Sequence, residues 1–181
     1  MGLFNKAVYM KPASILLTLS IVAFSFTGCS KEDQKPITNR WINNTVQLLE
    51  LNKDKPTITE GIAGTLTLIE GNCMPMIPRN STCREYPVQR TIKIYPYTTM
   101  QEVNQIDFVY FTIDAAPILT VESDAEGFYQ ASLPPGTYSV FVQENGKLYA
   151  NSFDGQRGIN PVQVEEDSLS TLNLRLDYAV Y

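Results

Sequence analysis

Histidine is absent from this chain of 181 residues. Its absence excludes Ser-His-Asp and Cys-His catalysis, histidine-ligated zinc and any histidine general base. Basic residues are also few, 14 against 19 acidic residues, which gives a net charge of −5. An acidic chain lacks the positive surface that binding to nucleic acid or to an anionic lipid surface requires. The sequence shows neither a nucleophile paired with a base nor a metal-ligand set, so it predicts a protein that is not an enzyme and uses no cofactor.

A hydrophobic run long enough to span a membrane is missing as well. The apolar stretch Ile15–Phe26 has about 12 residues, whereas a transmembrane helix needs roughly 20. It follows Lys6 and Lys11, an order typical of a bacterial export signal. The segment Phe26-Thr27-Gly28-Cys29 resembles a lipobox, with Phe26 where leucine is usual. The resemblance implies that residues 1–28 are a signal peptide and that acylated Cys29 anchors the mature chain in a lipid bilayer. An ordinary cleaved signal peptide and a membrane helix are the alternatives.

The charged block Ser30-Lys31-Glu32-Asp33 directly follows this cysteine. It resembles the surface-export signal of Bacteroidetes lipoproteins, in which a lysine and acidic residues follow the lipidated cysteine. We therefore expect a lipid-anchored outer-membrane protein that faces the cell exterior, with a periplasmic orientation as the alternative. Loss of residues 1–28 would leave 12 basic and 19 acidic residues and a net charge of −7.

The three cysteines are an odd number for an exported chain. Acylation of Cys29 would leave Cys73 and Cys83 as a pair, and disulfides persist in an oxidising compartment. We therefore predict a disulfide between them. It would close a loop of about 11 residues and stabilise the fold by roughly 3 kcal/mol on the chain-entropy model.

Residues 29–57 read as the lipidated cysteine followed by a flexible tether, and residues 58–181 as the folded domain. The first part of the tether is rich in polar residues and proline, but Trp41, Leu48 and Leu51 interrupt this polarity. Two interpretations of the apolar residues remain open. They form a short helix or strand that docks on the domain, or they form a segment that binds a partner.

From Gly61 onward, apolar residues alternate with a period of two. Such short segments separated by turn residues predict an all-β domain, an antiparallel β-sandwich of about seven or eight strands. The expected strands cover residues 62–69, 91–95, 108–111, 118–121, 128–133, 138–142, 148–151 and 171–180.

Three turns are specified by their residues. Asp124–Gly127 fits a type I turn, Leu133-Pro134-Pro135-Gly136 forces a reversal, and Asn145-Gly146 is a strong hairpin signal. Residues 128–151 are therefore expected to form a three-stranded β-meander. The stretch Ser123–Val140 resembles the carboxypeptidase regulatory-like domain family, whose relatives include the transthyretin-like domains. The resemblance implies a prealbumin-like sandwich with a non-catalytic role.

Three candidate sites stand out. The loop Glu70–Cys83 contains Met74, Pro75, Met76 and Ile77, which form either a contact surface for a partner or an apolar cover over the open end of the sandwich. The polar loop Asn151–Gly158 would bind sugar or calcium, or merely connect two strands. A glycan-stacking platform could come from six strand tyrosines, although tyrosine is also a common strand residue. They are Tyr86, Tyr95, Tyr97, Tyr110, Tyr129 and Tyr149.

The leading functional hypothesis is a structural or adhesive module at the outer membrane that contacts other envelope proteins. One alternative is a glycan-binding accessory of a polysaccharide-uptake system. Another is an anchored component of a secretion or pilus assembly.

Overall fold

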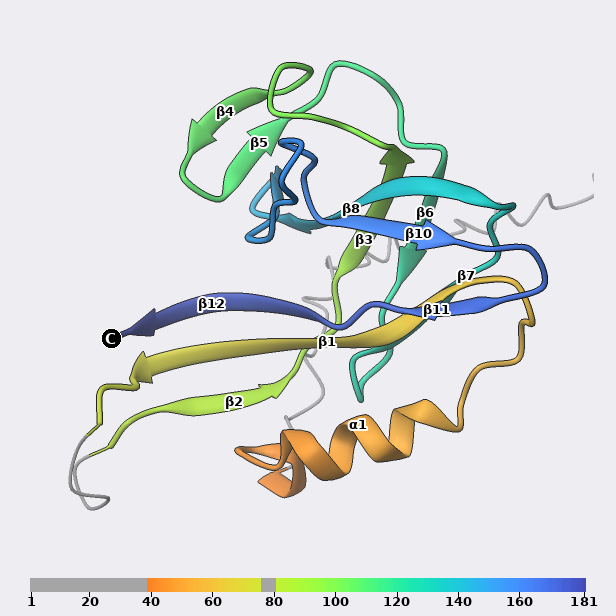
Figure 1. Cartoon of the computed structure of the whole chain (residues 1–181). Coiled ribbons are helices and arrows are strands. Elements are labelled where there is room, and N and C mark those ends of the chain that lie inside the picture. Colours follow the sequence, from red (N-terminus) through yellow and green to blue (C-terminus); the bar gives the residue numbers. More distant parts are fainter. Residues whose placement is uncertain (1–38, 76–80) are drawn as a thin grey trace, which may run out of the picture. The chain divides into compact units, whose positions relative to one another are not determined.

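The computed structural model describes residues 39–75 and 81–181, which contain twelve β-strands in two sheets (Figure 1). The first sheet holds five strands: β1 (Gly61–Asn72), β2 (Arg84–Pro87), β7 (Phe128–Ala131), β11 (Leu169–Thr171) and β12 (Leu174–Val180). The second holds seven: β3 (Thr91–Pro96), β4 (Asn104–Asp107), β5 (Tyr110–Thr112), β6 (Leu119–Glu122), β8 (Gly136–Glu144), β9 (Lys147–Tyr149) and β10 (Pro161–Val164). The predicted all-β sandwich is thereby confirmed, and its assignment to the prealbumin-like type stays a prediction.

The long strand β1 accounts for two of the strands beyond the seven or eight expected, β2 and β11, whereas β4 and β10 are additional strands of the second sheet. On one edge it pairs antiparallel with β7 and then with β2, and on the other it pairs parallel with β11 and then with β12. The change from β11 to β12 occurs beside Gly64, where a Cβ atom would overlap the Leu172 carbonyl. Asn173 accepts the Thr65 N–H there at 3.0 Å. Two short strands along each edge therefore take the place of one long strand.

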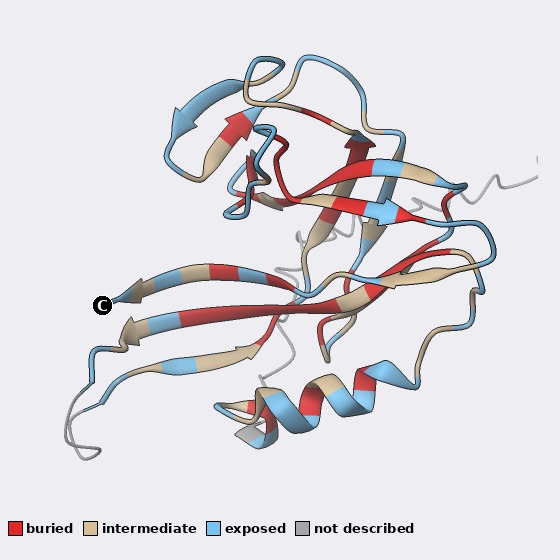
Figure 2. Cartoon of the chain, viewed as in Figure 1, coloured by how far each residue is buried: buried red, intermediate tan, exposed pale blue. Residues whose placement is uncertain are grey.

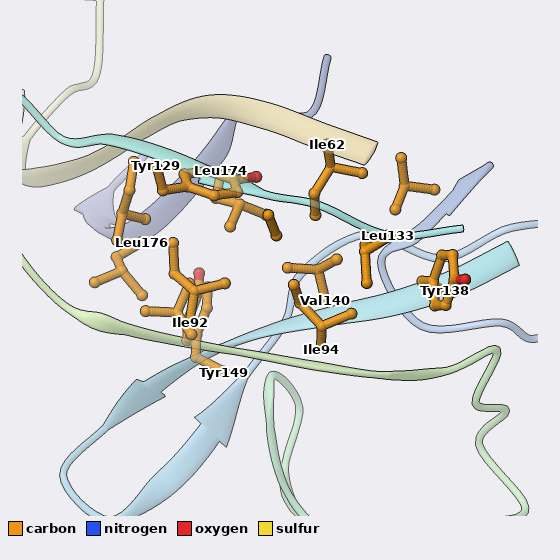
Figure 3. Close-up of a cluster of buried hydrophobic side chains, with 14 of the residues drawn as sticks. Ile62, Ile92, Ile94, Tyr129, Leu133, Tyr138, Val140, Tyr149, Leu174 and Leu176 are labelled. Carbon is orange, nitrogen blue, oxygen red and sulfur yellow. The ribbon is translucent and has the colours of Figure 1, made fainter. Parts of the chain in front are cut away.

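The main core lies between the two sheets (Figure 3). Alternate residues of a strand point to the same face, so Ile92 and Ile94 of β3 share the inner face with Val140 of β8. They pack against Leu174 and Leu176 of β12 from the opposite sheet. Each of these side chains is almost fully buried, which contributes about 1.5–3 kcal/mol per residue relative to exposure.

The outer face of β1 is covered by the segment before it. This segment forms the 3₁₀ turn η1 (Asn39–Trp41) and the helix α1 (Thr45–Lys53). Trp41 and Leu48 are buried, and β1 is correspondingly buried on both faces over most of residues 61–69 (Figure 2). The docked segment lies inside the stretch 29–57 expected as tether, so the folded unit begins before the expected boundary at residue 58. Of the two interpretations of these apolar residues, docking is the one the geometry supports.

The turn at Asp124 forms as predicted. The Gly127 N–H donates to the Asp124 carbonyl at 2.9 Å, and Asp124 Oδ1 accepts the N–H groups of Glu126 and Phe128 at 2.8 Å each. The hairpin between β8 and β9 is also confirmed. Asn145 and Gly146 both have positive φ there, as a tight two-residue hairpin turn requires.

The predicted β-meander over residues 128–151 is wrong. Strand β7 pairs with β1 in the first sheet, whereas β8 and β9 belong to the second. The reversal at Pro134-Pro135-Gly136 therefore carries the chain from one layer to the other. The Tyr138 hydroxyl donates to the Pro134 carbonyl at 2.8 Å, and this hydrogen bond links β8 to the reversal that precedes it.

A smaller core lies on the other face of the seven-stranded sheet, where Tyr95, Phe111 and Phe141 pack edge to face. Ile159, from the connection between β9 and β10, is fully buried in the same cluster. This connection therefore covers part of the outer face of the sheet.

Candidate functional site

The disulfide between Cys73 and Cys83 is present and joins the end of β1 to the start of β2, with 4.7 Å between their Cα atoms. The Cys73 N–H donates to the Val180 carbonyl at 2.9 Å, so the staple also fastens the end of β12. Met74 is exposed and so is Pro75. Met76 and Ile77, the rest of the expected contact loop, lie outside the described residues, as does Cys29.

The strand edges beside this staple are capped by side chains. Asn43 binds Glu85 of β2 like a neighbouring strand, donating its N–H to the Glu85 carbonyl at 2.8 Å and accepting the Glu85 N–H on Oδ1 at 2.7 Å. On β12, the Asp177 N–H donates to the Tyr149 hydroxyl at 2.9 Å. Free edge groups invite pairing with another chain, so these hydrogen bonds disfavour strand addition at Glu85 of β2 and at Asp177 of β12.

Three tyrosines join the two sheets at the same end. We call Tyr110, Tyr149 and Tyr178 the tyrosine cluster. The rings of Tyr110 and Tyr178 each meet the Tyr149 ring edge to face, with centroids 5.4 and 6.3 Å apart. The hydroxyls of Tyr110 and Tyr178 share a hydrogen bond of 2.9 Å that links β5 to β12. At this end, tyrosine side chains rather than aliphatic side chains therefore fill the space between the two sheets.

Charged groups flank the cluster from both sheets. Arg90 and Glu144 continue the inward alternation of β3 and β8, and Arg90 Nε lies 2.9 Å from Glu144 Oε2. On the opposite sheet, the Tyr86 hydroxyl donates to Glu70 Oε1 at 2.9 Å. Glu70 stands opposite Tyr178 in the register of β1 and β12.

The phenols of Tyr86 and Tyr178 at this end ionise less readily than an ordinary tyrosine. Burial raises the pKa of Tyr178, and its hydrogen bond to Tyr110 and the negative charge of Glu144 raise it further. Burial and the Glu70 carboxylate raise the pKa of Tyr86, against the smaller opposing effect of Arg90. These groups can therefore donate and accept hydrogen bonds, whereas phenolate chemistry at neutral pH is disfavoured.

Four exposed apolar residues lie near members of the tyrosine cluster or near the disulfide in the sequence, and we call them the apolar rim. Its members are Met74, Ile106, Phe108 and Val180, of which Phe108 is 77% and Val180 61% exposed. Ile106 protrudes at an irregularity of the β4–β5 pairing, and Phe108 lies in the turn just before Tyr110. The β4–β5 hairpin and the end of β12 lie on the same side of the molecule (Figure 1). Exposed apolar side chains gathered in this way are typical of a protein contact surface.

Only part of the expected six-tyrosine platform comes together. Tyr110 and Tyr149 meet in the tyrosine cluster, with Tyr86 hydrogen-bonded to Glu70 in the same region. Tyr129 is fully buried, and its hydroxyl donates to the Leu172 carbonyl at 2.5 Å. The remaining two are on other faces: Tyr95 lies in the smaller core and Tyr97 contacts the loop 151–158. Sequence reasoning missed Tyr178 as a site residue, although it continues the alternation of the apolar residues Leu174 and Leu176 in the last strand.

Across residues 39–75 and 81–181, cysteine, aspartate and glutamate side chains form no group of three or more that could hold a metal ion. Within the same part of the chain, no helix has the length and apolar character needed to cross a membrane.

Comparison of the chain with protein-family models, with curated proteins and with solved structures gives no match.

Proposed function

We propose that this protein is a non-catalytic, lipid-anchored module of the outer membrane that docks other envelope proteins through the apolar rim. The observation that carries the proposal is the exposure of Phe108 and Val180 on a frame that is fixed by a disulfide and by capped strand edges. A rigid frame loses little conformational entropy on binding, so exposed apolar side chains on it suit an interface.

The anchor in this proposal rests on the sequence around Cys29. Replacement of Cys29 by alanine is expected to move the protein into the carbonate-soluble fraction of cells. Protease treatment of intact cells then distinguishes the two orientations, because only an outward-facing protein is stripped before the outer membrane is opened. Retention of the Cys29→Ala variant in the membrane pellet would contradict the lipid anchor. The docking surface does not depend on this result, because crosslinking tests it independently.

Site-specific photo-crosslinking tests the docking surface in intact cells. A benzophenone amino acid at Phe108 or at Val180 is expected to give the same adduct, and Val180→Ser should weaken the adduct formed at Phe108. Gln163 on β10 is a matched exposed control, and Val46 on α1 is an exposed apolar position away from the rim. Adducts of equal yield at Gln163 or Val46, or none at Phe108 and Val180, would contradict the proposal.

The glycan-binding alternative draws its support from a different set of residues, those that line a hollow beside Tyr97.

A further inference from the structure

A hollow of about 520 Å³ opens to solvent and shares no lining residue with the tyrosine cluster or its rim. It is lined by Tyr97, Thr137, Asp154, Gly155 and Gln156. These residues come from the segment after β3, from the start of β8 and from the connection between β9 and β10. A volume of this order lies within the range of small-ligand pockets.

Asp154 fixes the shape of the hollow. Its Oδ1 accepts the N–H groups of Gln156 and Gly158 at 2.8 and 2.7 Å, and its Oδ2 accepts the Tyr97 hydroxyl at 2.8 Å. Burial opposes the charge of Asp154, but these hydrogen bonds outweigh it and lower the pKa of the carboxyl. The same bond to Asp154 raises the pKa of Tyr97. The loop and the phenol are thus locked together before any ligand arrives.

Tyr97 provides a rigid aromatic wall. A Cβ atom at Gly158 would overlap the Tyr97 ring, so the backbone of Gly158 lies directly against it. A bridge between Thr99 and Gly158 and a hydrogen bond of 3.0 Å from the Ile159 N–H to the Thr98 carbonyl hold the two segments in place. Binding against a ring that is already fixed costs little rotamer entropy.

The lining selects the chemistry of the ligand. Thr137 and Gln156 are exposed, and in the described residues their side chains make no hydrogen bond, which leaves a hydroxyl and a carboxamide free to bind. Among the residues that the structure describes, no cationic side chain lines the hollow, and ionised Asp154 in an acidic protein repels anions. The oxygens of Asp154 already accept three hydrogen bonds, which makes the carboxylate a poor partner for a cation.

An aromatic ring beside a hydroxyl and a carboxamide, with the Asp154 carboxylate already hydrogen-bonded, complements a sugar ring. The C–H face of a pyranose stacks on the electron-rich face of an aromatic ring, while its hydroxyls reach donors and acceptors at the edge. We propose that the hollow beside Tyr97 binds one neutral pyranose unit of a glycan. This site is independent of the docking surface, so either one can fail without the other.

Titration of the ¹⁵N-labelled full chain in detergent micelles tests the proposal by NMR. The probes are the methyl pyranosides of glucose, galactose, mannose and N-acetylglucosamine. One stacked ring and a few hydrogen bonds correspond to a Kd on the order of 1 mM, so titration runs to about 50 mM. The expected result is a saturable shift of the Gly155, Gln156 and Gly158 amides with at least one probe.

Gly155 offers a matched pair of variants, because a Cβ there would meet no atom within 4 Å. Gly155→Ala is expected to bind like the wild type, whereas Gly155→Trp places an indole at the hollow and should weaken binding about tenfold or more. Unchanged amide shifts outside residues 151–160 verify that both variants are folded. The proposal is overturned if no pyranoside gives a saturable shift at the Gly155, Gln156 and Gly158 amides, or if Gly155→Trp binds like the wild type. Calcium chloride is titrated as a control, and shifts of these amides with calcium chloride alone would also overturn it.

Discussion

Replacement of Leu48 by alanine tests whether α1 belongs to the folded unit. Leu48 is fully buried on the outer face of the first sheet. Leu→Ala changes in cores cost about 2–5 kcal/mol, and because α1 covers only one face and can settle into the space, we expect about 3 kcal/mol. Asn52 would then hold the helix by two hydrogen bonds, 2.9 Å to Thr65 Oγ1 and 2.8 Å to the Glu126 carbonyl. Each is worth about 1 kcal/mol, too little to offset the loss.

The position of the single tryptophan makes the assay specific. Trp41 is the only tryptophan of the chain and is buried in η1, directly before α1. Its fluorescence therefore reports the docking of this segment, while circular dichroism reports the strands. In Leu48→Ala, about 3 kcal/mol corresponds to roughly a hundredfold larger undocked population. We expect its Trp41 emission to shift to the red at lower urea concentration than in the wild type.

Val46→Ala is the control within the same helix. Val46 is 72% exposed, so this change should alter the free energy of unfolding by less than about 0.5 kcal/mol. If Leu48→Ala and Val46→Ala give the same Trp41 midpoint as the wild type, the docking of α1 does not depend on Leu48 and the reasoning is refuted.

Three further predictions concern the sandwich itself. Replacement of both Cys73 and Cys83 by serine should lower the free energy of unfolding by roughly 3 kcal/mol through loop entropy, seen as a lower urea midpoint; an unchanged midpoint would contradict this. Gly64→Ala should cost more than about 4 kcal/mol or prevent folding, because its Cβ overlaps the neighbouring backbone, and native-like stability would contradict the pairing of β1. Burial raises the pKa of Tyr129 and Tyr178 above the ordinary 10.0, so their phenols ionise more readily in the unfolded chain and stability should fall as pH rises above 10. Tyrosinate absorbance measured beside circular dichroism checks this, and complete ionisation near pH 10 with native dichroism retained would refute it.

The candidate surfaces could be foreseen only in part. The disulfide partners could be predicted from the number of cysteines, because acylation of one would leave a single pair. The loop containing Asp154 could be recognised from its polar composition. The tyrosine cluster could not be predicted, because Tyr110 and Tyr178 are 68 residues apart and their pairing depends on which sheet each strand joins. The capping of Glu85 by Asn43 is equally non-local, since the partners are 42 residues apart.

By itself, the sequence determined the all-β class, most strand positions and the local turns, because side-chain period and turn chemistry are properties of neighbouring residues. Asn145-Gly146, for example, favours a two-residue hairpin turn whichever sheet its two strands belong to. The tertiary structure alone decided that β7 and β8 belong to different sheets, although a short proline-rich reversal joins them. It also decided that α1 docks on β1 and that Tyr97 faces Asp154. Such pairings are set by burial and backbone hydrogen bonding between distant segments, and no local pattern encodes them.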